Sequence, residues 1–324
     1  MTPLLPPPEL RLQPPPQTAR DALGRLSAAL REVPAKRRGD NLLIGTWNIK
    51  ALSRVNRKWA TATGDSPLRN LQDMCAIADV ISRFDVVALV EVKRDLEALR
   101  LLMQILGPNW SFIVSDVTEG DPGNSERLAY VFDLKRVKPS GLAGEIVIPD
   151  SVLRDPEAVI REQFARTPYA VSFKAGAKGF TLVSLHIKWG TASQRTPEIT
   201  AIAQWLKDRA DDEDEFNRNL IALGDFNIDR LGDPNWEAFI GLGLTPPDAL
   251  LDAPRTVGER RGLNSFYDQI AWFTKGRREA LTLSYRAAGT FDWTAHILQE
   301  VARNSTKEAR ISDHFPLWAE FGLA

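Results

Sequence analysis

From Asn41 onward, short apolar runs rich in β-branched residues alternate with longer amphipathic segments. Each run is bounded by Gly, Pro, Asp or Asn, which is typical of strands separated by turns. The pattern predicts strands over 42–48, 85–91, 111–115, 127–132, 168–174, 180–187, 219–224, 266–273, 281–285 and 315–321. It predicts helices over 68–83, 95–106, 197–209 and 292–303. Helices interspersed irregularly among many strands favour an α/β sandwich of packed sheets.

The first 40 residues have a different pattern. Seven of the 21 prolines lie within residues 1–16, and this predicts a tail without regular structure. Thr18 then caps a short amphipathic helix that ends near Pro34. We therefore divide the chain into a proline-rich leader with a short helix (1–40) and a main domain (41–324). In the helix expected over 197–209, Thr196 is the expected cap and Pro197 lies in the first turn.

Composition narrows the class of protein. The chain has 324 residues, of which 44% are hydrophobic, so it can bury a large core. The 41 basic and 42 acidic residues nearly cancel, so net charge does not indicate a polyanion partner. The single Cys75 excludes an internal disulfide and a cysteine zinc site. No apolar run reaches the roughly 20 residues that span a bilayer, so we expect a soluble, cytoplasmic protein without membrane insertion, with secretion left open.

Candidate chemistry lies where polar residues end apolar strands. Asn48, Glu91, His186 and the pair Asp225 and Asn227 each follow such a run. Any one of them alone is more often a turn or a cap. Burying carboxylates repeatedly at strand ends is costly unless a shared partner compensates, and a hard cation is the natural candidate.

Two further segments carry similar residues. Asp268 lies inside the apolar strand expected over 266–273, and the adjacent Asp313 and His314 precede the last strand. The structural alternative for Asp268 is a hydrogen-bonded aspartate in the core. The alternative for Asp313 and His314 is an ordinary surface pair. The third histidine, His296, is interpreted as structural.

Taken in chain order, eight motifs resemble the endonuclease/exonuclease/phosphatase superfamily, and most closely its deoxyribonuclease I branch. They are GTWNI (45–49), VVALVEVKRD (86–95), NSERLAYVF (124–132), FARTPYAVSF (164–173), VSLHI (183–187), LGDFN (223–227), FYDQI (266–270) and ISDHFP (311–316). The resemblance implies a four-layered α/β/β/α sandwich whose catalytic domain spans 41–324. It implies that the site lies at one edge, where strand ends converge.

The resemblance also implies a metal site. Glu91, Asn48, Asp313 and Asp225 match residues that hold or surround an essential divalent ion. Oxygen ligands of this kind suit Mg²⁺, with Mn²⁺ and Ca²⁺ as alternatives. Whether one or two ions bind is left open.

For catalysis, the resemblance implies two histidine–carboxylate pairs. Glu126 matches the residue that orients His186, and Asp268 matches the residue that orients His314. The imidazoles would act as general base and general acid, in an order left open. The implied reaction is in-line attack of activated water on phosphorus, with no covalent enzyme intermediate.

Six residues are candidates for positioning the substrate or the attacking water. Arg166 matches a phosphate-contacting arginine, and Asn227 with Asp225 matches residues that position phosphate or water. Lys93 stands where the family has an arginine, and Lys188 with Trp189 follows His186, where an aromatic ring can stack on any base. A tryptophan that covers the core edge is the alternative for Trp189.

The leading hypothesis is therefore a Mg²⁺-dependent DNA endonuclease with little sequence preference. DNA is favoured over RNA, and no protein partner is expected. The tyrosine that the deoxyribonuclease I branch places before the Glu126 motif is missing, which weakens the expectation of duplex binding. The alternatives are a phosphodiesterase or phosphatase acting on lipid head groups or small phosphates, and a silent scaffold that keeps the fold. A basic rim would indicate a nuclease and an apolar lip a lipid enzyme.

Overall fold

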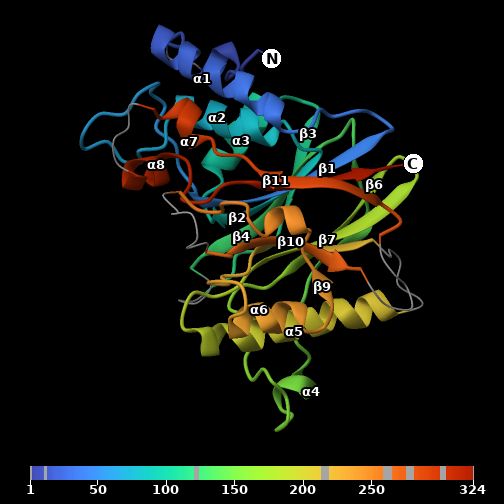
Figure 1. Cartoon of the computed structure of the whole chain (residues 1–324). Coiled ribbons are helices and arrows are strands. Elements are labelled where there is room, and N and C mark those ends of the chain that lie inside the picture. The colour runs from blue at the N-terminus through green and yellow to red at the C-terminus, as the bar shows by residue number, and fades with distance from the viewer. Residues whose placement is uncertain are drawn as a thin grey trace.

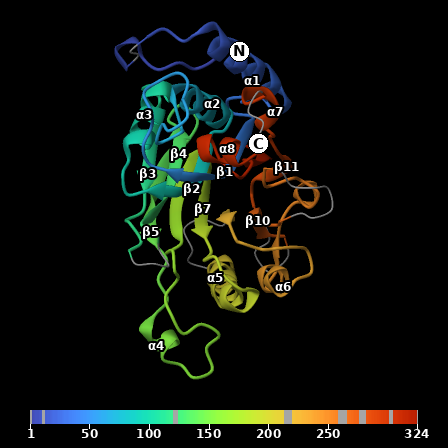
Figure 2. The ribbon, with the colours of Figure 1, turned by 90° about the vertical axis from the view of Figure 1, so that its left-hand side faces the viewer.

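The computed structural model describes residues 2–10, 13–119, 124–212, 219–257, 265–274, 281–299 and 304–323. Two six-stranded sheets pack face to face, and helices cover the outer face of each (Figures 1 and 2). The α/β/β/α sandwich expected from the sequence is therefore confirmed. Within the described ranges, no helix combines the length and the apolar character that crossing a bilayer requires.

The first sheet has the strand order β11-β12-β1-β2-β4-β3. Only β1 and β2 are parallel, and every other neighbouring pair is antiparallel. Its strands are β1 (Asn41–Leu52), β2 (Val86–Lys93), β3 (Trp110–Val114), β4 (Glu126–Asp133), β11 (Ser284–Thr290) and β12 (Leu317–Gly322).

The second sheet has the order β5-β6-β7-β8-β10-β9, and here only β7 and β8 are parallel. Parallel neighbours end at the same edge of a sheet, so each sheet brings two strand ends together. The strands are β5 (Lys138–Glu145), β6 (Tyr169–Ala175), β7 (Lys178–His186), β8 (Leu220–Asp225), β9 (Leu244–Thr245) and β10 (Asp268–Phe273).

The helices form the two outer layers (Figure 1). Over the first sheet lie α1 (Gln17–Ala29), α2 (Leu71–Ile81), α3 (Glu97–Leu106) and α7 (Thr294–Ile297), with α8 (Asn304–Arg310) at its edge. Over the second sheet lie α5 (Ala192–Asp211) and α6 (Pro234–Ile240), while α4 (Asp150–Leu153) lies on a loop that projects from the body (Figure 2). Short 3-10 helices span Pro8–Leu10, Leu30–Glu32 and Asp248–Leu250.

Central strands bury both faces, which explains their nearly continuous apolar sequences. In β1, Ile44 packs between the sheets, whereas Leu43 packs under the helices of the first layer. In β7, Leu182 packs between the sheets and Val183 packs under α5. Side chains alternate between faces along a strand, so each central strand contributes to two cores.

Two expected helices differ from the structure. α5 begins at Ala192 and not at residue 197, because the backbone N–H of Thr191 donates to the side chain of Gln194 and fixes an earlier first turn. Pro197 therefore lies inside the helix. The helix expected over 292–303 is interrupted: α7 ends at Ile297, and residues 300–303 lie outside the described ranges.

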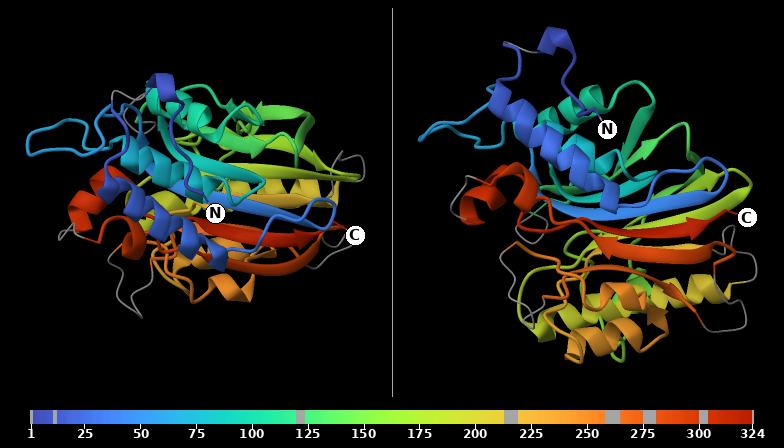
Figure 3. Two further views of the ribbon diagram at one scale, coloured as in Figure 1. Left: turned by 90° about the horizontal axis from the view of Figure 1, so that it is seen from above. Right: turned by 45° about the horizontal axis from the view of Figure 1, so that its top comes forward.

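The leader is more ordered than expected. α1 follows Pro16 without a side-chain cap from Thr18, and its apolar face joins the core under α2 and α3. Leu4, Leu5 and Leu10 pack against the same core. The leucines between the prolines thus attach the expected tail to the body. Figure 3 shows the course of the N-terminal segment near the helices of the first layer.

Several elements were not expected from the pattern. β5 is mostly exposed and lacks apolar alternation, since it forms as an edge strand through pairing with β6. β9, α4 and α6 are too short to produce a clear period. The strand expected over 281–285 is displaced toward the C-terminus, because β11 is a polar edge strand paired with β12.

Asp79 in α2 connects the leader to the body. Its carboxylate accepts hydrogen bonds from the backbone N–H of Leu4 (2.8 Å) and the hydroxyl of Ser27 (3.0 Å). Burial raises the pKa of Asp79 to about 6, although both hydrogen bonds oppose the shift. The charged form is therefore disfavoured in the folded chain.

This shift predicts a pH dependence of stability. The raised pKa of Asp79 adds to the free energy of unfolding, and this contribution is fully present below the pKa of the unfolded chain, near 3.8. The contribution is lost as the pH rises through the folded pKa of about 6. We expect the melting temperature of the wild type to fall relative to that of Asp79→Asn by about 2–4 °C between about pH 5 and pH 8. Calorimetry measures this, with Asp116→Asn as the exposed control that follows the wild type. Parallel curves for Asp79→Asn and the wild type would contradict the account.

Candidate active site

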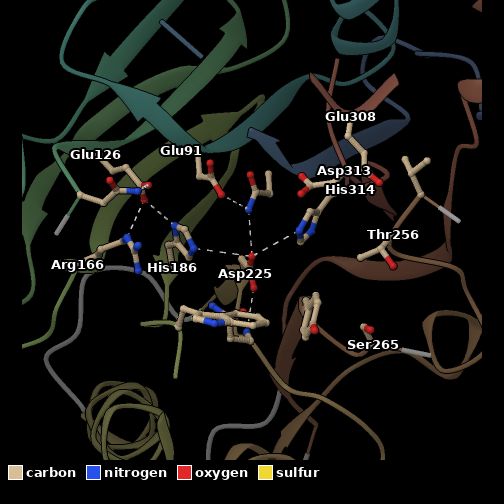
Figure 4. Close-up of a pocket in the computed structure, with 16 residues that line it drawn as sticks. Glu91, Glu126, Arg166, His186, Asp225, Thr256, Ser265, Glu308, Asp313 and His314 are labelled. Atoms are coloured by element: carbon tan, nitrogen blue, oxygen red, sulfur yellow. Dashed lines mark hydrogen bonds and ion pairs between the residues drawn. The ribbon is translucent and has the colours of Figure 1, made fainter. Parts of the chain in front are cut away.

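Strand ends from both sheets enclose a cleft of about 490 Å³ at one edge of the sandwich (Figure 4). Asn48 in β1 donates from Nδ2 to Oδ2 of Asp225 in β8 at 3.1 Å, which joins the two sheets directly. Most of the side chains expected at the site line this cleft: Asn48, Glu91, Glu126, Arg166, His186, Trp189, Asp225, Asn227, Asp313 and His314.

The backbone turns sharply where strands reach the cleft. Glu91 and Asn227 have φ values of 63° and 50°, in the left-handed region that side chains rarely adopt. Gly224 has φ of 129°, and a Cβ there would lie 2.1 Å from the carbonyl oxygen of Leu185. Glycine at this position lets β8 approach β7 closely, so Asp225 lies beside His186.

Glu126 holds His186 and Arg166 from the start of β4. Its Oε2 lies 3.0 Å from Nδ1 of His186 and 2.6 Å from Nε of Arg166. Its Oε1 accepts hydrogen bonds from Lys93 (2.9 Å) and Asn124 (2.7 Å). Burial opposes ionisation, but the contacts with His186 and Arg166 outweigh it and lower the pKa of Glu126 to about 2. Glu126 is therefore charged at neutral pH and directs Nε2 of His186 toward the cleft.

Asp268 holds His314 in the same way. Its Oδ2 lies 2.5 Å from Nδ1 of His314, and both side chains are buried. Burial lowers the pKa of His314, but the negative charges of Asp268, Asp225 and Asp313 outweigh it and raise the pKa. The contact through Nδ1 leaves Nε2 of His314 facing the cleft.

Asp225 lies between the two imidazoles. Its Oδ2 is 3.9 Å from Nε2 of His186 and 4.0 Å from Nε2 of His314 (Figure 4). Its Oδ1 accepts a hydrogen bond from the backbone N–H of Asn227 at 2.9 Å. The side-chain amide of Asn227 donates to the carbonyl of Ile187 at 2.6 Å, which leaves its second N–H for another acceptor. A single small group in the cleft can therefore meet both histidines.

Asn48, Glu91 and Asp313 supply oxygen atoms that suit a divalent ion. Oε1 of Glu91 lies 3.0 Å from the amide of Asn48, and Oδ2 of Asp313 pairs with Nζ of Lys50 at 2.7 Å. Oδ1 of Asp313 is buried, and among the described residues it has no hydrogen-bond partner. A buried carboxylate oxygen in an oxygen-rich set fits a hard cation such as Mg²⁺.

Two groups of titratable residues also have the spacing of metal ligands. Glu91, Glu126 and His186 form one group, and Asp225, Asp268 and His314 form the other, each with ligand atoms within 4.8 Å of one another. The cleft therefore offers oxygen and nitrogen donors on both sides of Asp225.

The structure places three expected site residues behind or beside the cleft. Lys93 and Lys188 do not line it: Nζ of Lys93 donates to Glu126, and Nζ of Lys188 lies 3.9 Å from Glu198. Each ammonium group compensates the charge of a buried carboxylate. The position of a lysine next to a motif in the sequence does not reveal which carboxylate it will contact. Asp268 lies behind His314.

The exposed fraction of Trp189 is 69%, so it does not cover the core edge. Tyr267 also lines the cleft, and its ring centroid lies 6.1 Å from that of Trp189 and 6.0 Å from that of His314. Sequence reasoning passed over Tyr267, although it adjoins Asp268 in the motif FYDQI. It also missed Lys50 and Glu308, which no strand pattern marks.

Three polar side chains outside the cleft hold its walls in place. Nη2 of Arg69 donates to the carbonyls of Ile49 (2.9 Å) and Ile311 (2.8 Å), which ties the end of β1 to the loop before Asp313. Arg255 is fully buried and donates to the carbonyl of Asp268 at 2.8 Å. Ser312 donates to the carbonyl of Asn48 at 2.5 Å.

Comparisons with known proteins agree with this geometry. The sequence model described as the Endonuclease/Exonuclease/phosphatase family matches residues 45–314. A deoxyribonuclease of Thioalkalivibrio sp. (strain K90mix) is 24% identical over 293 residues, covering 87% of this chain and 71% of the relative. Deoxyribonuclease gamma of Rattus norvegicus is 26% identical over 274 residues, covering 80% of this chain and 81% of the relative.

Solved structures share the fold. An endonuclease/exonuclease/phosphatase family protein from Bacteroides thetaiotaomicron superposes with a TM-score of 0.58 at 15% identity, covering 88% of this chain and 98% of that chain. A mannosyl-6-phosphatase from the same organism gives a TM-score of 0.57 at 16% identity, covering 86% and 99%.

The oxygen donors predict a measurable affinity for divalent ions. We expect Mg²⁺ or Mn²⁺ in millimolar excess to raise the melting temperature, because a ligand that binds only the folded chain stabilises it. Glu91→Gln should remove most of this gain, since it takes away a charged oxygen. Glu119→Gln, an exposed carboxylate outside the cleft, is the matched control and should keep the gain. An undiminished gain in Glu91→Gln would contradict the assignment of Glu91 to the ion.

Proposed function

Because the chain belongs to the Endonuclease/Exonuclease/phosphatase family, it is a hydrolase of that family, and we propose that it is a Mg²⁺-dependent DNA endonuclease with little sequence preference. Two curated relatives named as deoxyribonucleases support the nuclease assignment. The absence of a recognisable base-reading module in the sequence supports low specificity, since hydrolysis of backbone phosphates does not require base contacts.

The observation that carries this proposal is the pair of imidazoles on either side of Asp225. His186 and His314 each present Nε2 to the same carboxylate oxygen at about 4 Å. A phosphodiester placed there has one imidazole near the attacking water and the other near the leaving oxygen. One histidine accepts a proton from water as its oxygen bonds to phosphorus, and the other protonates the leaving oxygen as the P–O bond breaks.

Glu126 and Asp268 act through these histidines. Each carboxylate contacts Nδ1, which fixes the tautomer and stabilises the imidazolium that forms when Nε2 takes a proton. The two pairs therefore share this arrangement and lie on different sides of the phosphate.

Phosphate binding falls to Arg166 and Asn227. Nη1 of Arg166 is buried, and in the described part of the chain it has no hydrogen-bond partner. Asn227 keeps one amide N–H, as described above. Glu91, Asn48 and Asp313, with Asp225 beside them, would hold the ion, which supplies positive charge against the negative charge that develops on the phosphate oxygens.

Trp189 and Tyr267 indicate where a nucleotide next to the scissile phosphate lies. Their rings form an edge-to-face pair at 78°, and Tyr267 continues the row to His314. The guanidinium of Arg195 lies 6.0 Å from the Trp189 ring and is itself fixed by the carbonyl of Asn227. An exposed indole supported in this way can stack on an unpaired base.

A substrate panel tests the proposed activity. Plasmid, linear duplex, single-stranded DNA, RNA and a lipid phosphodiester are incubated with Mg²⁺ or with chelator. We expect metal-dependent nicking of plasmid that falls about 10²–10⁴-fold in His186→Ala and in His314→Ala, the range for losing a general acid or base. His296→Ala, the third histidine, lies outside the cleft and should keep wild-type activity. Cleavage of the lipid alone, or of small phosphates alone, would replace this proposal by the phosphodiesterase or phosphatase alternative.

Trp189 is tested separately. Trp189→Ala should raise KM for a single-stranded oligonucleotide about tenfold with little change in kcat, because stacking is worth about 1–3 kcal/mol per base. Trp189→Phe keeps an aromatic face and should restore most of the affinity. Equal KM values for all three proteins would remove Trp189 from the substrate site.

A further inference from the structure

The catalytic cleft does not by itself attract a polyanion. Among the described residues that line it, the residues that can carry a positive charge, Arg166, His186 and His314, are outnumbered by five carboxylates: Glu91, Glu126, Asp225, Glu308 and Asp313. In the described part of the chain, the lining of the cleft is therefore more acidic than basic. Duplex DNA carries one negative charge per about 1.7 Å, so its affinity for proteins comes largely from cations.

A second cavity, of about 550 Å³, has the opposite character. It is lined by five cationic residues and by no Asp or Glu: Arg38, Lys135, Arg136, Lys138 and Lys174. Three separate segments supply them, namely the turn before β1, the β4–β5 connection with the start of β5, and the end of β6. The fold thus gathers positive charge at one place in a chain whose net charge is −1.

This cavity lies at the far end of the sheets from the catalytic cleft. α8, which carries Glu308 of the cleft, and the C-terminus, next to Leu323 of the cavity, lie at opposite ends in Figure 3. β7 starts at Lys178, beside the hairpin that follows Lys174, and ends at His186. Eight steps of about 3.3 Å make this strand about 26 Å long, so the two sites lie about one strand length apart.

Only one of the five charges serves the fold. Arg136 pairs with both carboxylate oxygens of Asp85 at 2.8 and 3.1 Å and donates to the carbonyl of Asn41 at 2.6 Å. In contrast, the structure records no hydrogen bond or ion pair with a described residue for the side chains of Arg38, Lys135, Lys138 and Lys174.

Two of these cations also oppose each other in the sheet. Lys138 and Lys174 are direct partners across the β5–β6 ladder. Like charges directly opposite on neighbouring strands destabilise a sheet. Stability therefore gives no reason for this arrangement, whereas a bound anion would compensate it.

We propose that Arg38, Lys135, Lys138 and Lys174 form a second binding site for the phosphate backbone of the nucleic acid on which the catalytic cleft acts. The identity of the ligand rests on the proposed function. A span of about 26 Å corresponds to about eight base pairs, so a substrate must be longer than this to reach both sites. Attachment at one site raises the effective concentration of phosphodiester at the other.

A hollow site with cations on its walls fits an inserted phosphate chain better than a flat bilayer surface. Its apolar lining consists of Leu134, Leu323 and Pro139, which offers no amphipathic face for insertion into lipid. A nucleic acid is therefore favoured over an anionic membrane.

The test compares two triple variants with the same change in net charge. Lys135→Gln/Lys138→Gln/Lys174→Gln removes three positive charges from the cavity, and Arg31→Gln/Arg154→Gln/Arg25→Gln removes three exposed positive charges elsewhere. Binding of a duplex of about 40 base pairs is followed by fluorescence anisotropy in chelator, over a range of salt concentrations, so that no hydrolysis is needed. The same proteins are assayed with Mg²⁺ on that duplex and on bis(4-nitrophenyl) phosphate, which is too small to reach both sites.

We expect the cavity variant to bind the duplex at least about tenfold more weakly and to lose about 2–3 units of the log–log salt slope, one per phosphate contact. Its kcat/KM should fall on the duplex and stay unchanged on the small ester, while the control variant matches the wild type. Equal binding and equal slopes in both variants would overturn the second site. Binding of anionic phosphatidylserine vesicles that is lost in the cavity variant, with DNA binding unchanged, would assign the surface to a membrane instead. If the wild type hydrolyses neither the duplex nor bis(4-nitrophenyl) phosphate, the proposed function fails. The binding comparison in chelator still decides whether the second site exists.

Discussion

The accumulation of negative charge at the edge where the two sheets meet is the constraint on which the site depends. Buried carboxylates are stable only if donors or cations surround them. Here Glu126 is compensated by His186, Arg166 and Lys93, Asp268 by His314, and Asp313 in part by Lys50. The oxygen of Asp313 that stays unpartnered within the described residues marks where compensation from the chain itself ends. In the proposed function, a divalent ion and the phosphate that it attracts would complete the charge balance.

The scaffold turns this constraint into geometry. Parallel pairs in both sheets bring Asn48, Glu91, His186 and Asp225 to one edge, and the glycine before Asp225 lets two strands approach closely enough for that carboxylate to meet both histidines. Arg69 and Arg255 fix the loops beyond the strand ends through backbone carbonyls. Rigid supports around a charged cleft are what preorganised catalysis requires. Under the proposal of a second site, Arg38, Lys135, Lys138 and Lys174 at the far end, for which no partner is recorded among the described residues, add an attractive surface.

The sequence predicted the parts of the structure in which local pattern and tertiary role coincide. β1, β2, β7 and β8 were found because strands buried on both faces read as apolar runs, and the polar residues that end them pointed to the cleft. β5 was missed because an edge strand needs no apolar alternation. The start of α5 was misplaced because both Thr191 and Thr196 are residues of a type that caps helices, and the helix begins after Thr191. The partners of Lys93 and Lys188 depend on which acids lie nearby in space, which no spacing reveals. Tyr267 could have been predicted from the sequence because it adjoins Asp268, whereas no sequence pattern identifies Lys50 or Glu308.

The central claim is that both imidazoles and the metal-binding oxygens serve one phosphate. A crystal structure of the protein with Mn²⁺ and a short phosphorothioate oligonucleotide tests this most directly, because the anomalous signal of manganese locates the ion. The account predicts manganese on the oxygens of Glu91 and Asp313 and one backbone phosphorus between the Nε2 atoms of His186 and His314. A phosphate bound away from either imidazole, or manganese bound outside this cleft, would contradict it.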